Sequence, residues 1–439
     1  MCSILGLIDF ECKDQSKNLK INKINNLLAH RGPNDKGYYN DPFISLAFNR
    51  LSIMDLVNGN QPVVKNHIIT IFNGEIYNFK EIRNELKNFG FDFKTNSDSE
   101  IIASAFLKWG IKCIDKFNGM FAIAIYDKKN RKIYLVRDRV GIKPLYYSHL
   151  NGSLIFCSEI KGIVNYPSFK KSLNFNALSS YLSFRYPMGE NNNFFKHIQK
   201  VLPGSYIEIN IENKNIQKTK YWSIPAIGSS KNYNEDYYLH KLDSLLSTSI
   251  KKQLVSDAPL GVFLSGGLDS SILSSIASKS ITGKLKTYSV GFKEKGYDET
   301  SKARLISKYI GSEHTEVFVE KDDFFKNLSK IIEIKDTPLS IPHEYPIFLL
   351  GKKMKEDIKV VISGEGADEF FGGYSRVQKS PIDFLKTKYL GNLTNYKFLS
   401  KIFSIDKNFD FKNSEFLDYF FHKYNWFSFK ETNELLSAD

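Results

Sequence analysis

The chain has 439 residues, too many for one ordinary hydrophobic core, so two domains are expected. Hydrophobic residues make up 42% of it and include 35 Phe and 24 Tyr, a composition that excludes wholesale disorder. The 61 Lys and Arg outnumber the 48 Asp and Glu and give a net charge of +13. These basic residues are scattered and form no nucleic-acid motif, so we expect a solvated surface and no nucleic-acid partner.

The four cysteines, at positions 2, 12, 113 and 157, form no C-x-x-C pair and no metal-ligand spacing. Cysteines in this arrangement are typical of a protein in a reducing compartment. The first residues lack the basic and apolar regions of a signal peptide, and no apolar run approaches the ~20 residues that span a bilayer. We therefore expect a cytoplasmic protein without a membrane partner.

Residues 1–222 contain short segments rich in Ile, Val, Phe and Tyr, which predict strands. Ser97 and Glu100 have the spacing of a capping box before a helical run at 101–109. An alternating stretch between Pro203 and Trp222 predicts a closing hairpin. This domain is therefore expected to be α+β, built on antiparallel sheet. Its strands are predicted at 3–8, 44–53, 67–72, 119–126, 132–137 and 154–158.

A polar linker is predicted at 223–235, and the second domain, 236–439, has a different pattern. It opens with apolar residues at helical spacing between Leu239 and Ile250. Strands and helices then alternate, which predicts an α/β domain with a doubly wound parallel sheet. The strands are predicted at 261–264, 285–292, 314–319 and 358–362, and the helices at 271–281, 299–310, 324–332 and 346–355.

Cys2 stands behind a Met that cells commonly remove before small side chains. Removal would place a free α-amine, which titrates near ~8, beside the thiol, where it can act as a local base. The thiolate can then attack a carboxamide and release ammonia. A small buried hydrophobe is the other interpretation of Cys2.

The surrounding motifs offer what acyl transfer from an amino acid needs. Asn73 and Gly74 follow an apolar strand, where a side-chain amide and a backbone N–H can converge on an oxyanion. Arg50 can grip a carboxylate, and Glu75 and Asp98 can receive an ammonium group. Structural interpretations are also open: Arg50 as a member of a surface ion pair, Asn73 and Gly74 as an ordinary turn, and Asp98 as a helix-start residue.

The order of these motifs resembles a known family. Cys2, His30–Pro33, Arg50–Ile53, Asn73–Asn78, Ser97–Glu100 and Arg137–Tyr146 occur in the order found in the glutaminase domain of class II (N-terminal-nucleophile) amidotransferases, in its asparagine-synthetase branch. The resemblance implies an αββα sandwich with Cys2 as nucleophile and Asn73 with Gly74 as the oxyanion hole. The implied glutamine contacts are Arg50, Leu51, Ser52, Ile53, Met54, Asn73, Gly74, Glu75 and Asp98. His30 is expected to be structural, because the family uses the terminal amine as base.

A second motif, Leu264–Ser271, lies between a predicted strand and a predicted helix. Its glycines allow close backbone approach, so its N–H groups, its Ser hydroxyls and the helix N-terminus can cradle a phosphate. It lacks the Gly-Lys-Ser/Thr of a Walker A loop and resembles the SGGxDS pattern of PP-loop ATP pyrophosphatases. A plain Gly/Ser-rich turn is the alternative interpretation.

A third motif, Ser363–Tyr374, follows the predicted strand 358–362 and resembles the asparagine-synthetase SGEGxDExFGGY pattern. It is expected at the carboxyl edge of the same sheet, and an acidic surface turn is the alternative. The resemblance implies a role for Glu365 in forming a β-aspartyl-AMP intermediate, and Asp269 and Asp368 are the candidates for Mg²⁺. The ATP contacts are predicted to be Leu264, Ser265, Gly266, Gly267, Asp269, Ser270, Val290, Ser363 and Gly364.

We therefore expect a glutamine-dependent asparagine synthetase that uses glutamine, aspartate, ATP and Mg²⁺; a homodimer is one assembly compatible with the sequence. The resemblance covers residues 1 to about 376. Residues 377–439 lack the family's Arg-Val-Pro-Phe-Leu-Asp-type stretch and its later Lys, so the second domain is expected to be C-terminally incomplete. Two alternatives stay open: amidation of another carboxylate, such as a uronic acid of surface glycan, and a truncated nucleotide-binding remnant.

Overall fold

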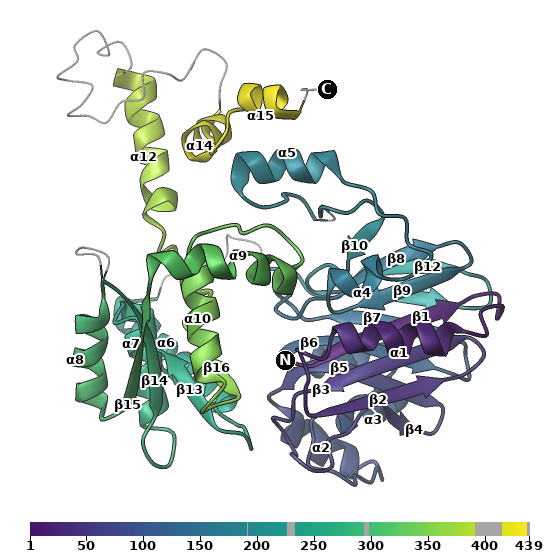
Figure 1. The fold of residues 1–439 in the computed structure, drawn as a ribbon. Coiled ribbons are helices and arrows are strands. Elements are labelled where there is room, and N and C mark those ends of the chain that lie inside the picture. The colour runs from purple at the N-terminus through teal and green to yellow at the C-terminus, as the bar shows by residue number, and fades with distance from the viewer. Residues whose placement is uncertain (191, 226–232, 294–297, 391–414, 437–439) are drawn as a thin grey trace.

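The computed structural model describes residues 1–439 except 191, 226–232, 294–297, 391–414 and 437–439. We call residues 1–222 the N-terminal half and the described residues after them the C-terminal half. Figure 1 shows the two halves side by side, with the chain's N-terminus on the side of the first half that faces the second.

Two six-stranded sheets, antiparallel in the strand pairs that the register records, form the N-terminal half. The first has the order β10-β8-β9-β1-β3-β2 and the second β12-β11-β7-β6-β5-β4. The first contains β1 (Ser3–Asp9), β2 (Asp35–Asn40), β3 (Ile44–Arg50), β8 (Tyr146–Leu150), β9 (Ser153–Cys157) and β10 (Ile198–Lys200). The second contains β4 (Val63–Lys65), β5 (Ile68–Ile76), β6 (Gly119–Asp127), β7 (Lys132–Arg137), β11 (Ser205–Asn210) and β12 (Ile216–Lys220).

These sheets are packed face to face and covered by helices on their outer faces. Ile4, Phe48, Ile71 and Leu135 are among the buried residues of the core between the sheets. α1 (Lys17–Leu27) and α4 (Ile160–Val164) cover the first sheet, and α2 (Phe79–Lys87), α3 (Glu100–Trp109) and the 3-10 helix η1 (Gly110–Lys116) cover the second. Because both faces of the central strands are buried, these strands read as continuous apolar runs. The predicted αββα sandwich is confirmed.

The C-terminal half is built on a parallel sheet of order β15-β14-β13-β16. Core contacts put α6 and α7 on one face and α10 on the other. The predicted doubly wound α/β architecture is confirmed. The strands are β13 (Leu260–Phe263), β14 (Lys286–Phe292), β15 (Glu313–Val319) and β16 (Val360–Ile362), and the helices are α6 (Glu235–Gln253), α7 (Leu268–Ser278), α8 (Thr300–Ile310), α9 (Lys321–Lys335), α10 (Glu344–Met354) and α11 (Ala367–Phe371).

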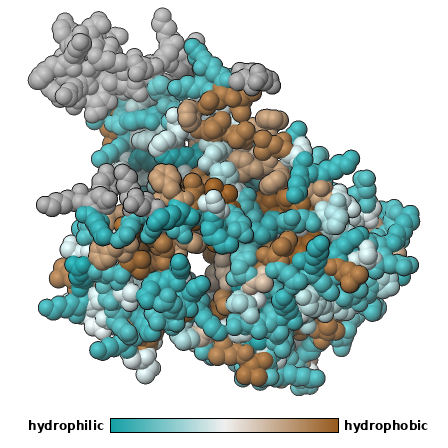
Figure 2. Space-filling model, in the orientation of Figure 1, coloured by the Kyte–Doolittle hydropathy of each residue, from teal (hydrophilic) through white to brown (hydrophobic). Residues whose placement is uncertain are grey.

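The last described helices return to the N-terminal half. α15 (Phe429–Leu436) packs on α5 (Phe175–Phe184), where the hydroxyls of Ser183 and Thr432 are 3.3 Å apart. α12 (Ser375–Leu390) and α14 (Phe416–Tyr424) precede it. In Figure 2, hydrophilic side chains cover most of the visible face, and hydrophobic ones gather where the two halves meet.

Three local predictions are wrong. The strand predicted at 44–53 ends at Arg50, whereas the one predicted at 67–72 continues to Ile76, because residues 73–76 pair with β6. The capping box is also absent at the start of α3. The Glu100 carboxylate instead accepts the backbone N–H groups of Lys94 and Thr95, and Ser99 makes no capping hydrogen bond.

Two candidate active sites and the contact between them

Cys2 lies at the start of β1, beside the end of β3. Its Sγ accepts the N–H of Leu51 at 3.4 Å and lies 3.7 Å from the carbonyl oxygen of Leu51. Burial raises the pKa of the thiol; the Leu51 N–H and the nearby terminal amine oppose this shift, and the charges of Glu75 and Asp98 add to it. The thiol therefore stays protonated until a base removes its proton.

The terminal amine beside this thiol has the properties of such a base. Burial lowers the pKa of the Met1 α-amine to about 6, and the cations Arg31 and Lys143 act in the same direction. A large fraction of the amine is therefore neutral at pH 7. In the chain as written this amine belongs to Met1, and removal of Met1 would transfer the role to the amine of Cys2.

Asn73 and Gly74 lie inside β5 rather than in a turn after it. Asn73 Nδ2 is buried and has no hydrogen-bond partner among the described residues. A Cβ on Gly74 would lie 2.1 Å from the carbonyl oxygen of Met120, so only glycine fits against β6 there. The strand therefore presents a free amide donor next to a position without a side chain, which suits an oxyanion site.

Glu75 and Asp98 form a pair of interacting carboxylates near Cys2. Asp98 accepts the N–H of Ile76 at 2.9 Å and is 4% exposed. Burial raises the pKa of Asp98 to about 6, and burial together with the charge of Asp98 raises the pKa of Glu75. An ammonium group placed between them would lower both pKa values, so the pair is suited to binding a cation.

Arg50 is buried and its guanidinium donates to the loop that follows it. Nη1 lies 2.9 Å from Oδ1 of Asn60, and Nη2 donates to the carbonyl oxygens of Met54 and Asp55. We call residues 51–60 the glutamine loop, because it contains the predicted contacts Leu51, Ser52, Ile53 and Met54. Ser52 is fixed by its N–H, which donates to Oδ1 of Asn34 at 3.0 Å. Arg50 thus shapes this loop besides being a candidate carboxylate contact.

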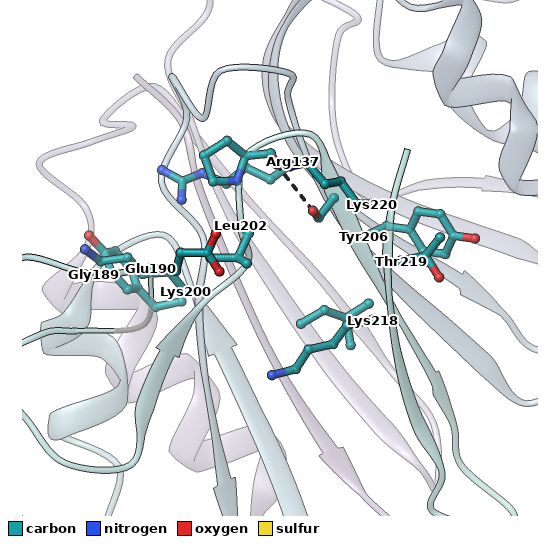
Figure 3. A pocket seen from close by; sticks show the side chains of 13 residues that line it. Arg137, Gly189, Glu190, Lys200, Leu202, Tyr206, Lys218, Thr219 and Lys220 are labelled. Carbon is teal, nitrogen blue, oxygen red and sulfur yellow. Dashed lines mark hydrogen bonds between the residues drawn. The ribbon is translucent and has the colours of Figure 1, made fainter. Parts of the chain in front are cut away.

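The motif at residues 137–146 proves structural. The buried Asp138 accepts the N–H groups of Phe121, Ile142 and Lys143 at 2.9–3.1 Å. Arg137 donates to three backbone carbonyl groups. A cavity of about 740 Å³ adjoins Arg137 at the open edge of the sandwich (Figure 3), and none of the predicted site residues lines it.

A line of buried and partly buried charges, which was not predicted as part of the site, links Cys2 to the C-terminal half. Arg31 Nε donates to the carbonyl oxygen of Cys2 at 2.9 Å, and Nη1 lies 2.9 Å from the Glu159 carboxylate. Lys161 lies 3.2 Å from Glu159 and 3.3 Å from Asp336, which follows α9. His30, predicted to be structural, also contacts Glu159, at 3.1 Å. Arg31 lies in a quoted motif, but no sequence pattern marks Glu159.

The phosphate-loop motif lies between β13 and α7, as predicted. A Cβ on Gly266, which has a φ of +81°, would lie 2.7 Å from the backbone of Ala303 in α8, so glycine is required there. The Ser265 and Ser270 hydroxyls are 3.0 Å apart, and Gly267 precedes the first turn of α7. Leu264 is fully buried, so only its backbone can meet a ligand, and Val290, which lies in β14, packs on the core.

The third motif meets this loop at the carboxyl ends of β13 and β16. An added Cβ on Gly364 would lie 3.2 Å from Cβ of Asp269, so the two segments are in contact. A cavity of about 230 Å³ is lined by Ser265, Gly267, Asp269, Ser270, Ser363, Gly364, Glu365 and Asp368, together with four neighbours. The structure therefore brings together most of the residues predicted to contact ATP.

Within the part of the chain that the structure describes, no group of three His, Cys, Asp or Glu side chains is placed to hold a metal ion. Asp269 and Asp368 do line one cavity. Two carboxylates fit Mg²⁺ when phosphate oxygens supply further ligands. None of the described helices is long and apolar enough to cross a bilayer.

Comparison with known proteins assigns a family to each half of the chain. Residues 1–222 match the glutamine amidotransferase domain family and residues 241–427 the asparagine synthase family. A putative glutamine-hydrolysing asparagine synthetase 2 of Methanocaldococcus jannaschii is 33% identical over 88% of this chain and 78% of its own. The chain belongs to the family of glutamine-hydrolysing asparagine synthetases. The resemblance drawn from the motifs is confirmed.

Two further relatives, both from Bacillus subtilis, are longer than this chain. Glutamine-hydrolysing asparagine synthetase 1 is 34% identical over 87% of this chain and 60% of its own length. Asparagine synthetase 2 is 36% identical over 85% of this chain and 52% of its own. The chain thus spans little more than half the length of these two members of the family.

Proposed function

We propose that this protein is a glutamine-dependent asparagine synthetase. The Cys2 thiolate attacks the amide carbon of glutamine, ammonia leaves, and water hydrolyses the resulting thioester to glutamate. In the second site aspartate displaces pyrophosphate from ATP and becomes β-aspartyl-AMP. Ammonia then displaces AMP and gives asparagine.

The observation that carries the proposal is the arrangement around Cys2. The Cys2 thiol, whose pKa burial raises, lies beside the amine of Met1, whose pKa burial lowers, and Asn73 offers an amide without a partner in the described structure. A base, a nucleophile and an oxyanion donor are what amide cleavage requires. The proposed glutamine contacts remain Arg50, Leu51, Ser52, Ile53, Met54, Glu75 and Asp98.

In the second site we assign ATP to the cavity between the two glycine-rich motifs. Gly267, Asp269 and Ser270, at the start of α7, line that cavity, and the N-terminus of a helix favours an anion. Asp269 and Asp368 would hold Mg²⁺, which neutralises phosphate charge when bound. Glu365, which is exposed on the cavity wall, would then lie near the aspartate that is activated.

Cys2→Ala tests the glutaminase assignment. Synthesis of asparagine, AMP and pyrophosphate from glutamine should be lost, while synthesis from ammonium salt should persist, because only the nucleophile is missing. Products are measured by mass spectrometry. Glutamine-dependent synthesis that survives in Cys2→Ala would contradict the assignment.

The acceptor is tested with a panel of carboxylates that includes aspartate and uronic acids. We expect pyrophosphate release to depend on aspartate. Release with a uronic acid alone would identify a different amidotransferase, and ATP binding without turnover would indicate a nucleotide-binding remnant.

A further inference from the structure

The C-terminal half contacts the glutamine loop directly through Asp257. The N–H of Asp257 donates to the carbonyl oxygen of Ile53 at 3.1 Å. In return, the Asp257 carboxylate accepts the N–H of Asp55 at 2.7 Å. Two hydrogen bonds therefore join one residue of the second half to both sides of Met54.

Asp55 organises both segments that are proposed to bind glutamine. Its carboxylate accepts the N–H of Asn58 within the loop at 3.0 Å and the N–H of Asn96 at 2.7 Å. Asn96 lies two residues before Asp98. A displacement of Asp55 would therefore disturb the glutamine loop and the segment that leads to Asp98 together.

Besides Asp257, the glutamine loop is held by the Arg50 guanidinium, which donates to Met54, Asp55 and Asn60. Leu56 and Val57 are 45% and 77% exposed, and the loop, α2, Val255 and Asp257 line a cleft of about 700 Å³. Asp55 has a φ of +43°, in the left-handed region that costs a non-glycine residue energy. An exposed loop with a strained residue depends on its hydrogen bonds to keep one conformation.

Asp257 itself stands on a rigid part of the second half. It lies three residues before β13, whose carboxyl end carries the phosphate loop. The carbonyl oxygen of Pro259 accepts the N–H of Lys359 at 2.9 Å, just before β16, whose carboxyl end carries Ser363. Asp257 thus lies near the amino ends of β13 and β16, the two strands whose carboxyl ends carry the proposed ATP cavity.

We propose that Asp257 is a positioning residue for the glutaminase site, through which the synthetase half holds the glutamine loop in its binding conformation. This inference rests on the proposed function, because it assumes that glutamine binds against residues 51–54. Asp257 acts as a hydrogen-bond acceptor for Asp55 and does not touch the reacting atoms.

Three full-length variants distinguish a hydrogen-bonding role of Asp257 from an effect of its charge and from an unspecific effect of substitution in this half. Asp257→Ala removes the acceptor, and Asp257→Asn keeps an acceptor oxygen without the charge. Asp243→Ala is the matched control, since Asp243 is exposed on α6 of the same half. The Kd for glutamine is measured by calorimetry with Cys2→Ala added to each variant, which prevents turnover. Amide hydrogen exchange of residues 51–60 is measured without glutamine.

Asp257→Ala should raise the Kd for glutamine about three- to tenfold, the effect of one lost hydrogen bond. It should also speed exchange of the Asp55 amide. Asp257→Asn should stay within about twofold of the parent, because a neutral oxygen still accepts the bond. Asp243→Ala should change neither measurement, and ammonia-dependent synthesis should be equal in all variants that carry Cys2.

Unchanged exchange of the glutamine loop in Asp257→Ala would overturn the inference, whether or not glutamine binds. An equally large rise in the Kd for glutamine in Asp257→Asn would also overturn the inference, because the charge of Asp257 rather than its hydrogen bond would then be responsible. If the Cys2→Ala parent binds no glutamine at all, the proposed function fails instead, and the exchange rates still decide whether Asp257 holds the loop.

Discussion

At the scale of single residues, the proposed glutaminase site holds an amide without a partner in the described structure and a buried carboxylate. Buried donors normally have partners, because an unpaired buried polar group costs about 1–3 kcal/mol. Asn73 Nδ2 departs from this rule in the described structure, and Asp98 keeps a carboxylate in a buried position. Both features make sense if glutamine supplies the missing partners, an oxyanion for one and an ammonium group for the other.

Asn73→Ala should lower kcat for glutamine hydrolysis by about 10²–10³-fold, the usual effect of losing one oxyanion donor. The KM for glutamine should change much less, because the bond forms fully only in the transition state. Steady-state glutamate release measures both constants. A KM effect with unchanged kcat would place Asn73 in ground-state binding instead.

The KM for glutamine should rise as the pH falls below about 6. Burial raises the pKa of Asp98 to about 6, so Asp98 takes up a proton as the pH falls through that value and loses the charge that holds ammonium. The rise should approach about tenfold per pH unit, the limit for one linked proton. Asp98→Asn should have a high KM that does not depend on pH in this range. A wild-type KM that is flat between about pH 5 and 7 would contradict the role of Asp98.

At the scale of elements, side chains at and just after the end of β9 link Cys2 to the end of α9 through ion pairs and hydrogen bonds. Glu159 lies between Arg31 and Lys161, and all three side chains are at most 16% exposed. Burial alone would raise the pKa of Glu159, but hydrogen bonds and charges from His30 and Arg31 prevail and lower it to about 2. Since this is below its ordinary value of 4.5, ionised Glu159 stabilises the fold above pH 4.5, and this contribution is lost as the pH falls toward 2.

Glu159→Gln should lower the free energy of unfolding by about 3 kcal/mol at pH 7, because it leaves the buried Arg31 guanidinium without its carboxylate partner, whereas Lys161 keeps Asp336. Urea unfolding measures the change. The difference from wild type should shrink as the pH falls below the ordinary pKa of the carboxyl group. The control is Glu85→Gln, which breaks an exposed ion pair with Lys116 and should cost less than about 1 kcal/mol. Equal losses in the two variants would contradict the role of Glu159.

At the scale of the whole molecule, the two proposed reactions belong to separate cores. The amidotransferase sandwich carries Cys2, and the parallel sheet brings two glycine-rich segments, about 100 residues apart in sequence, to one edge. The halves meet through contacts such as those of Lys161 and Asp257, neither of which belongs to the ATP cavity. Damage at the ATP cavity should therefore leave glutamine hydrolysis intact.

Asp269→Asn tests this independence. Aspartate-dependent release of pyrophosphate should fall at least about 10²-fold, because a carboxylate that holds Mg²⁺ beside the phosphates is lost. Glutamine hydrolysis, followed as glutamate release, should stay within about twofold of wild type. A parallel loss of both activities would show that the ATP cavity controls the glutaminase site.

Much of the molecule is determined by the sequence alone. Apolar runs bounded by turn residues predict both cores, because burial of strand and helix faces depends on local residue order. The motifs around Cys2, Ser265 and Ser363 indicate the family, because close backbone approach needs glycine and each proposed reaction needs particular side chains. Boundaries such as the end of β5 were missed, since pairing with β6 carries residues 73–76 into the strand.

Only the tertiary structure decides how Cys2 and the glutamine loop are held. Arg31, the neighbouring pair Glu159 and Lys161, and Asp336 come from three distant parts of the chain and form one line of charges only after both halves have folded. Likewise, nothing near Asp257 in the sequence indicates that it bonds to Asp55, 202 positions earlier. Isolated charged residues carry no local signal, because their role depends on the distant group that folding places beside them.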